Sequence, residues 1–239
     1  MTAEDKTRLA LLLDTAGAFL RDCHWRERKA PPVFEDDVPA EPGGDSLETI
    51  AVEIHECRAC GLCGLRILPV PGEGVPQPRV LVIGEAPGSE EDERGKPFVG
   101  VAGHLLDRML ASVNLSRTTN CFITNTVKCR PPGNRDPSPE ETASCAPFLA
   151  RQIRVLRPAY ILCMGRIAAQ TMLRTGEGIG RLRGKFFDYT PEYPPDNNAA
   201  IAPVIPLIAT YHPSALLRDA ELKRPAWEDL KKLLARIQT

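Results

Sequence analysis

Three polar residues that can take part in chemistry follow apolar segments of the kind that form buried strands. Glu85 follows VLVIG, Asn125 ends CFITN, and His212 comes after the apolar run that begins at Val204. The carboxyl ends of parallel strands open into one crevice of an α/β sheet, so we expect the carboxylate, the amide and the imidazole to meet there. Each has an ordinary alternative on its own: a solvated loop carboxylate, a turn-forming amide or a loop histidine. Their convergence on one sheet edge is typical of a catalytic crevice.

Further residues lie at the predicted mouth of this crevice. Ala86, Pro87 and Gly88 turn the chain sharply after the first strand. A polar loop then leads to GKPFVG, in which two glycines and a proline hold the ring of Phe98 at a fixed place. Asn125 can both donate and accept hydrogen bonds, as reading the edge of a nucleobase or of another amide-like ring requires. The histidine is followed by a hydroxyl, two leucines and a guanidinium, which belong to Ser214, Leu216, Leu217 and Arg218.

Eight cysteines in a chain that shows no secretion signal argue against a disulfide framework and for metal binding, catalysis or burial. Cys57, Cys60 and Cys63 form a C-x2-C-x2-C run. Cys129 and Cys145 flank a segment too rich in Pro, Gly and Asn to have a core of its own. Four thiolates suit either zinc or an iron–sulfur cluster. The spacing alone therefore predicts a metal site and leaves the choice of metal open.

The elements that must position these residues alternate along the chain. We predict strands at 79–84, 121–127, 160–164 and 204–211. Helices are predicted at 102–113, 139–155, 166–173 and 225–237, and another at 47–57 that Ser46 caps. Such alternation predicts an α/β fold, a three-layer αβα sandwich with a central four-stranded, mostly parallel sheet. Cys121 and Cys163 then fall within strands, as buried thiols.

The chain has 239 residues, enough for one good core and an appendage. We expect an N-terminal helical extension over residues 1–30, an acidic, Pro-rich linker over 31–46, and the catalytic domain over 47–239, with a surface loop at 191–203. The sequence has no run of 18 apolar residues, so we expect no membrane segment and a cytoplasmic protein. A net charge of −1 excludes a polycation that holds nucleic acid by charge alone, although basic residues are in excess in the C-terminal half.

Several separate motifs occur together in one order: CRAC, GEAPGSEEDERGKPFVGVAG, ITNTVKCRPPGNRDP, the region of Cys145, RGK and YHPSALLR. Together they resemble the family 4 uracil-DNA glycosylases, the iron–sulfur branch of the uracil-DNA glycosylase superfamily. The resemblance covers residues 50–237. It implies a monofunctional enzyme that hydrolyses the N-glycosidic bond of uracil and leaves an abasic site, the first step of base excision repair.

The resemblance also implies the metal. It indicates a structural [4Fe–4S] cluster with Cys57, Cys60, Cys129 and Cys145 as ligands, and Cys63 would then be no ligand. The expected partner is uracil-containing DNA, single- or double-stranded, and the protein is expected to act as a monomer.

Roles for the crevice residues follow from the same resemblance. The enzyme would flip uracil out of the duplex, because a base inside the stack cannot be reached. Phe98 would stack on the ring and Asn125 would pair with its polar edge. His212 would donate to the negative charge that develops on uracil O2, and Glu85 would orient the attacking water and stabilise the cationic sugar.

The remaining residues are expected to bind the substrate. The turn of Ala86, Pro87 and Gly88 would line the site, Ser214 and Arg218 are suited to phosphate contacts, and Leu216 or Leu217 would fill the vacated stack. Two other readings stay open. The fold could be a DNA- or polymerase-binding module without catalysis, or a glycosylase for another damaged base.

Overall fold

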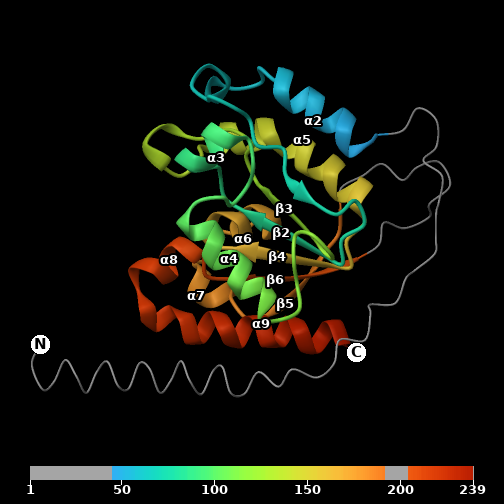
Figure 1. Ribbon diagram of the computed structural model, residues 1–239, viewed down its shortest axis with the longest axis vertical. Coiled ribbons are helices and arrows are strands. Elements are labelled where there is room, and N and C mark those ends of the chain that lie inside the picture. Colours follow the sequence, from blue (N-terminus) through green and yellow to red (C-terminus); the bar gives the residue numbers. More distant parts are fainter. Residues whose placement is uncertain (1–44, 192–203, 239) are drawn as a thin grey trace, which may run out of the picture. The chain divides into compact units, whose positions relative to one another are not determined.

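The computed structural model describes residues 45–191 and 204–238 (Figure 1). The predicted N-terminal extension, most of the predicted linker and most of the loop at 191–203 lie outside the described residues. No helix in the described part of the chain is long and apolar enough to cross a membrane.

Within the described residues the strands form one six-stranded sheet in the order β1-β3-β2-β4-β6-β5. Its four central strands pair in parallel, as predicted. The sheet has two more strands than the four predicted, because an antiparallel strand lies at each edge. The bounds are β1 (Glu73–Gly74), β2 (Val80–Gly84), β3 (Cys121–Asn125), β4 (Tyr160–Met164), β5 (Phe186–Tyr189) and β6 (Ile205–Thr210).

Helices cover both faces of this sheet, which confirms the α/β fold. The longer helices are α2 (Leu47–Glu56), α4 (Val101–Ala111), α5 (Pro139–Leu156), α6 (Arg166–Leu173) and α9 (Lys223–Gln238). The shorter ones are α3 (Ser89–Arg94), α7 (Ile179–Leu182) and α8 (Pro213–Arg218), with 3-10 turns η1 (Gly61–Gly64), η2 (Pro132–Asn134) and η3 (Ala220–Leu222). All five helices predicted from the sequence are present, and α3 and α8 lie in segments expected to be loops.

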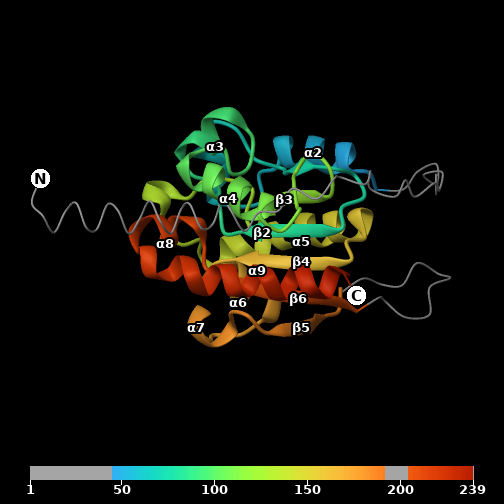
Figure 2. The same ribbon diagram turned by 60° about the horizontal axis from the view of Figure 1, so that its bottom comes forward.

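The central strands are apolar on both sides because both sides are covered. In β2, Val80 and Val82 pack in the core beneath α4 and α9, whereas Leu81 and Ile83 pack in the core beneath α5 and α6. Figure 1 shows the strands between α5 and α9, and Figure 2 shows α9 running along the sheet in front of β4 and β6. Cys121 and Cys163 are fully buried in these strands, as predicted.

A buried carboxylate fixes the end of β6, two residues before His212. Asp229 on α9 is fully buried and accepts a hydrogen bond from the hydroxyl of Thr210 at 2.8 Å. It also accepts from Arg183, at 2.7 Å from Nη2 and 2.9 Å from Nε. Two oxygens therefore join three segments of the chain beside the site.

Replacing this carboxylate should destabilise the whole domain. Asp229→Ala leaves the Arg183 guanidinium without its partner, and breaking a buried ion pair in this way costs about 3–5 kcal/mol of unfolding free energy. Urea unfolding followed by circular dichroism measures the loss. The control is Glu228→Ala, one residue earlier, where an exposed carboxylate bonds exposed Lys231 and the unfolding midpoint should not change. Equal midpoints for the two variants would contradict this role of Asp229.

Candidate active site

Parallel pairing of β2 with β3 places Glu85 and Asn125 at one edge of the sheet. Gly84 lies opposite Asn125 in the register. Hydrogen bonds continue past the strand ends, from the Thr126 N–H to the Gly84 carbonyl at 2.9 Å and from the Val127 N–H to the Glu85 carbonyl at 3.2 Å. The Thr126 hydroxyl also donates to the Glu85 carbonyl at 2.6 Å. The backbone of Glu85 is therefore hydrogen-bonded to the residues that directly follow Asn125.

Gly84 brings the side chains of Asn125 and Phe98 together. A Cβ at this glycine would lie 2.3 Å from Asn125 Oδ1 and 2.6 Å from Phe98 Cζ, so no larger residue fits. Asn125 is 1% exposed, and its Oδ1 accepts no hydrogen bond from the described residues. Buried polar atoms are nearly always paired. An unpaired acceptor beside an aromatic ring matches an N–H on the edge of a planar heterocycle.

His212 lies beside the same ring. Its imidazole centroid is 5.5 Å from that of Phe98, with the planes tilted by 34°. His212 caps α8, and its Nδ1 accepts from the backbone N–H of Ser214 at 3.2 Å. Burial, together with the positive charge of Arg218, lowers the histidine pKa to about 4, while Glu91 opposes the shift. The ring is therefore neutral at pH 7, and with Nδ1 accepting, its proton stands on Nε2.

Glu85 is partly buried and titrates near neutrality. Burial, together with the negative charge of nearby Asp136, raises its pKa to about 7, while Arg166 opposes the shift. Arg166 also donates a hydrogen bond to Asp136, so the two charges that act on Glu85 form one ion pair. A carboxyl group with this pKa exchanges protons at physiological pH, which suits general acid–base work.

Glu91, which was not predicted as a site residue, organises the loops around the site. Its Oε2 accepts from the Gly88 N–H at 3.0 Å, and its Oε1 accepts from the N–H groups of Val99 and Gly100 at 2.9 and 3.0 Å. One carboxylate thus ties the turn of Ala86, Pro87 and Gly88 to the loop of Phe98. Glu91 stands three residues after Gly88, at the third position of α3, a spacing typical of capping residues that could have identified it.

Helix α8 separates the two leucines that the sequence could not tell apart. Leu216 is 3% exposed and packs inward. Leu217 is 46% exposed. Arg218 is exposed at the end of the helix, whereas the Ser214 hydroxyl lies 2.8 Å from His212 Nδ1 and is engaged with the imidazole.

Five thiols line a separate small cavity of about 20 Å³ at the end of α2. They belong to Cys57, Cys60, Cys63, Cys129 and Cys145. No group of three or more His, Cys, Asp and Glu side chains in residues 45–191 and 204–238 has the close spacing that holds a metal ion. One zinc ion would draw its sulfur ligands to within about 4 Å of each other, given Zn–S bonds of about 2.3 Å. Iron–sulfur clusters are also held by cysteine thiolates, so the chemistry of this lining suits either kind of metal site.

Two basic residues meet the thiols, and neither was predicted. Arg66 donates from Nη1 to Cys129 Sγ at 3.0 Å and from Nη2 to the His55 carbonyl at 2.8 Å. The backbone N–H of Lys128 donates to Cys145 Sγ at 3.3 Å. Donors of this kind stabilise sulfur as thiolate.

Lys128 also joins the thiols to the strand that carries Asn125. Its ammonium is fully buried and donates to Thr124 Oγ1 at 2.6 Å, Gln152 Oε1 at 2.7 Å and the Asn125 carbonyl at 2.9 Å. These three acceptors are neutral, and burial lowers the pKa of the ammonium to about 8, while nearby Cys145 and Cys129 oppose that shift. The only signal in the sequence is a single lysine within the otherwise uncharged run CFITNTVKC.

Comparison with known proteins assigns the chain to a family. The model of the uracil DNA glycosylase superfamily matches residues 71–231. A type-4 uracil-DNA glycosylase of Archaeoglobus fulgidus is 40% identical over 193 residues, which cover 79% of this chain and 92% of that protein.

Two further relatives have the same name. The type-4 uracil-DNA glycosylase of Saccharolobus solfataricus is 41% identical over 194 residues, covering 79% of this chain and 85% of that protein. The type-4 uracil-DNA glycosylase of Thermotoga maritima is 39% identical over 189 residues, covering 78% and 92%. The resemblance in the sequence motifs is therefore confirmed, and the chain belongs to the type-4 family of the uracil-DNA glycosylase superfamily.

Proposed function

We propose that this protein removes uracil from DNA by hydrolysing the N-glycosidic bond, leaving an abasic site for base excision repair. The observation that carries the proposal is the meeting of the unpaired Asn125 acceptor, the Phe98 ring and a neutral His212 around Gly84, next to Glu85. The enzyme acts as a cytoplasmic monomer on uracil in single- or double-stranded DNA. A mispaired uracil is extruded at lower cost than a paired base.

The amide and the ring select the base. Phe98 stacks on the flipped uracil, while Asn125 Oδ1 accepts from its N3–H and Nδ2 donates to O4. Cytosine has an acceptor at N3 and a donor at C4, so it would oppose the amide at both positions. The buried acceptor supports this reading, since it gains its missing hydrogen bond only from a base with an N–H there.

His212 and Glu85 carry the chemistry. As the bond from C1′ to N1 breaks, its electron pair passes to uracil and the sugar becomes oxocarbenium-like. The Nε2–H of His212 donates to uracil O2, where negative charge develops, an effect worth on the order of 10²–10³ in rate. Ionised Glu85 stabilises the cationic sugar and orients the water whose oxygen bonds to C1′. That water gives its proton to the Glu85 carboxylate, which passes it to solvent, and uracil leaves as the anion or takes a proton from solvent.

The surface of α8 supplies DNA contacts. Leu217, the exposed leucine, fills the space that the flipped nucleotide leaves, and Arg218 meets a phosphate. The turn of Ala86, Pro87 and Gly88 forms one wall of the uracil site. Ser214 acts through its hydrogen bonds to His212.

Four thiols hold a [4Fe–4S] cluster, namely Cys57, Cys60, Cys129 and Cys145. The cavity that they line supports this assignment, and Arg66 and Lys128 supply the positive charge that thiolates require. The cluster serves structure: it joins α2 to α5 and to the loop after β3. Cys63 lines the same cavity and is not a ligand in this proposal.

Single-turnover cleavage of an oligonucleotide with one uracil, read on a gel after alkali treatment, tests the function. The wild-type protein should cut at the uracil and leave a cytosine control intact. Asn125→Asp should lower uracil release by about 10² and begin to release cytosine, because it replaces a donor with an acceptor. Asn114→Asp, exposed in the turn after α4, is the matched control. An unchanged preference in Asn125→Asp would exclude the recognition role, and intact uracil DNA after incubation with folded wild-type protein would favour the binding-module reading.

The rate should rise with pH through the pKa of Glu85. The free enzyme needs this carboxyl ionised, so kcat/KM should fall on the acid side of about pH 7 and level off above it. Asp136→Asn removes a negative neighbour and should move the midpoint to lower pH, whereas Arg166→Gln should move it to higher pH. Glu228→Gln, on the surface of α9, should leave it in place. If Asp136→Asn and Arg166→Gln moved the midpoint in the same direction, a group other than Glu85 would determine the acid side of the pH profile.

The thiol assignment predicts different results for neighbouring cysteines. Cys145→Ser should abolish the broad visible absorbance of the purified protein and lower its iron content, because serine replaces a cluster ligand. Cys63→Ser should keep the absorbance and about four irons per chain. Spectra and iron analysis of anaerobically purified protein measure both. Loss of colour in Cys63→Ser with retention in Cys145→Ser would reverse the assignment.

A further inference from the structure

The backbone of Phe98 adopts a conformation that its neighbours must hold in place. Its φ is +51°, in the left-handed region that residues with a Cβ rarely enter. Such a conformation persists only where the surroundings determine it, and it often occurs at binding sites. The direction of the ring depends on this backbone, so whatever fixes the loop also fixes the ring.

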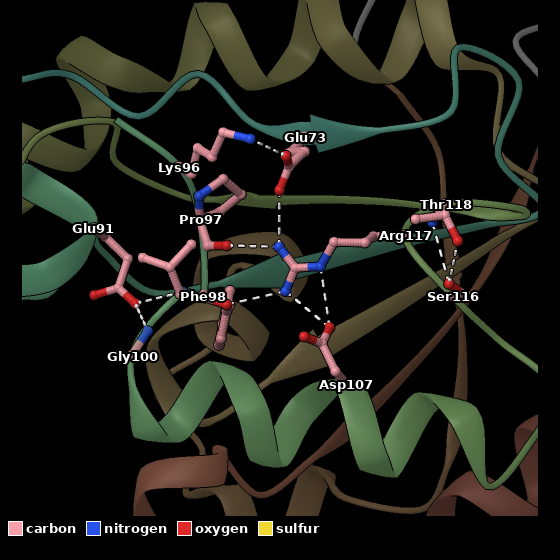
Figure 3. Close-up of polar contacts among 11 residues, drawn as sticks. Glu73, Glu91, Lys96, Pro97, Phe98, Gly100, Asp107, Ser116, Arg117 and Thr118 are labelled. Atoms are coloured by element: carbon pink, nitrogen blue, oxygen red, sulfur yellow. Dashed lines mark hydrogen bonds and ion pairs between the residues drawn. The ribbon is translucent and has the colours of Figure 1, made fainter. Parts of the chain in front are cut away.

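Arg117 holds the two carbonyl groups at this point. Its Nη1 donates to the Pro97 carbonyl at 2.9 Å and its Nη2 to the Phe98 carbonyl at 3.0 Å. Figure 3 shows the guanidinium pointing at both carbonyls from the segment before β3. The side chain is only 14% exposed. These two hydrogen bonds are thus largely shielded from competing water.

Two carboxylates orient this guanidinium from other elements. Asp107 on α4 accepts from Nη2 at 2.9 Å and from Nε at 3.1 Å through one oxygen, Oδ1. Glu73 in β1 accepts from Nη1 at 3.0 Å. We call Arg117, Asp107 and Glu73 the Arg117 clamp. Because its members come from three separate elements, the guanidinium has little freedom to turn (Figure 3).

The other side of the loop is held as well. Glu91 accepts from the N–H groups of Val99 and Gly100, the two residues that follow the ring. A cation therefore fixes the carbonyls of Pro97 and Phe98, and an anion fixes the next two amides. Helix α4 closes the remaining side, since a Cβ at Gly103 would lie 1.9 Å from the Phe98 carbonyl oxygen.

We propose that Arg117 is a positioning residue that sets the Phe98 ring for stacking on the flipped uracil. The inference rests on the proposed function and extends it to a side chain that touches neither the base nor the sugar. An arginine is required because its planar fork bonds two carbonyls at once, which a lysine ammonium does not reproduce. Small errors in the position of a group that orients the substrate can cost on the order of 10² in rate.

A double-mutant cycle between Arg117 and Phe98 tests the proposal. Arg117→Met should slow single-turnover uracil release by about 10- to 100-fold in the wild-type background. In a Phe98→Ala background the same change should cost less than about 3-fold, because there is no ring left to position. Arg117→Lys should not restore the rate. Equal penalties in both backgrounds would overturn the proposal.

Lys96→Met is the matched control. Lys96 lies in the same loop and also bonds Glu73, at 2.8 Å, but it is 61% exposed and bonds neither carbonyl. Its rate should stay within about 2-fold of the wild-type rate. If circular dichroism shows that Arg117→Met does not fold, Asp107→Asn takes its place in the same cycle. Asp107→Asn weakens the hold on the Arg117 guanidinium while the guanidinium keeps its positive charge.

Hydrogen exchange gives a readout that does not depend on DNA. The amides of Val99 and Gly100 should exchange faster in Arg117→Met than in the wild type. Their exchange rates in Lys96→Met should equal those of the wild type. A wild-type protein that releases no uracil would overturn the proposed function, while the exchange result would still decide whether the clamp orders the loop. If the wild-type protein releases uracil but Arg117→Met shows unchanged hydrogen exchange, only the positioning role of Arg117 is overturned.

Discussion

The site depends on the register between β2 and β3. Gly84 lies opposite Asn125, and the backbone bonds past the strand ends hold Glu85 beside the same strand. Successive strand residues face opposite sides of a sheet, so a slip of one residue would turn Asn125 away from Phe98 and exchange the residues that face the two cores. The apolar residues of β2, buried on both faces, oppose such a slip. Packing of ordinary hydrophobic residues thus sets the position of the Asn125 amide.

Much of this arrangement could be predicted because it is local or follows from topology. Apolar runs mark the four central strands, and helical composition marks the five longer helices. Parallel strands end on one side, so the placement of Glu85, Asn125 and His212 at a common edge needed no coordinates. The edge strands were missed for physical reasons. Strand β1 has only two residues, and β5 is exposed or half-buried along its length, so neither forms an apolar run.

The groups that hold the site could not be predicted, because their partners are far away in the sequence. Arg117 bonds carbonyls that lie 19 and 20 residues before it, and Lys128 bonds Gln152 on α5, 24 residues on. A surface arginine or lysine has the same sequence signature as these buried ones. Cysteine differs, because thiols two residues apart bring their sulfurs to one place whatever the rest of the fold does. The thiol cavity was therefore predictable, and its neighbouring cations were not.

Asn125 also carries a thermodynamic consequence for the free protein. A buried acceptor with no partner costs about 1–3 kcal/mol of folding stability, whereas an apolar residue of similar size would avoid that cost. Selection for stability alone would therefore replace Asn125, and under the proposed function its presence marks a position where discrimination between bases outweighs stability. The fully buried ammonium of Lys128 lies on the next turn of chain, bonded to the carbonyl of the same asparagine. An acceptor without a partner and a fully buried ammonium thus lie at the same strand end, and both are polar groups that are costly to bury.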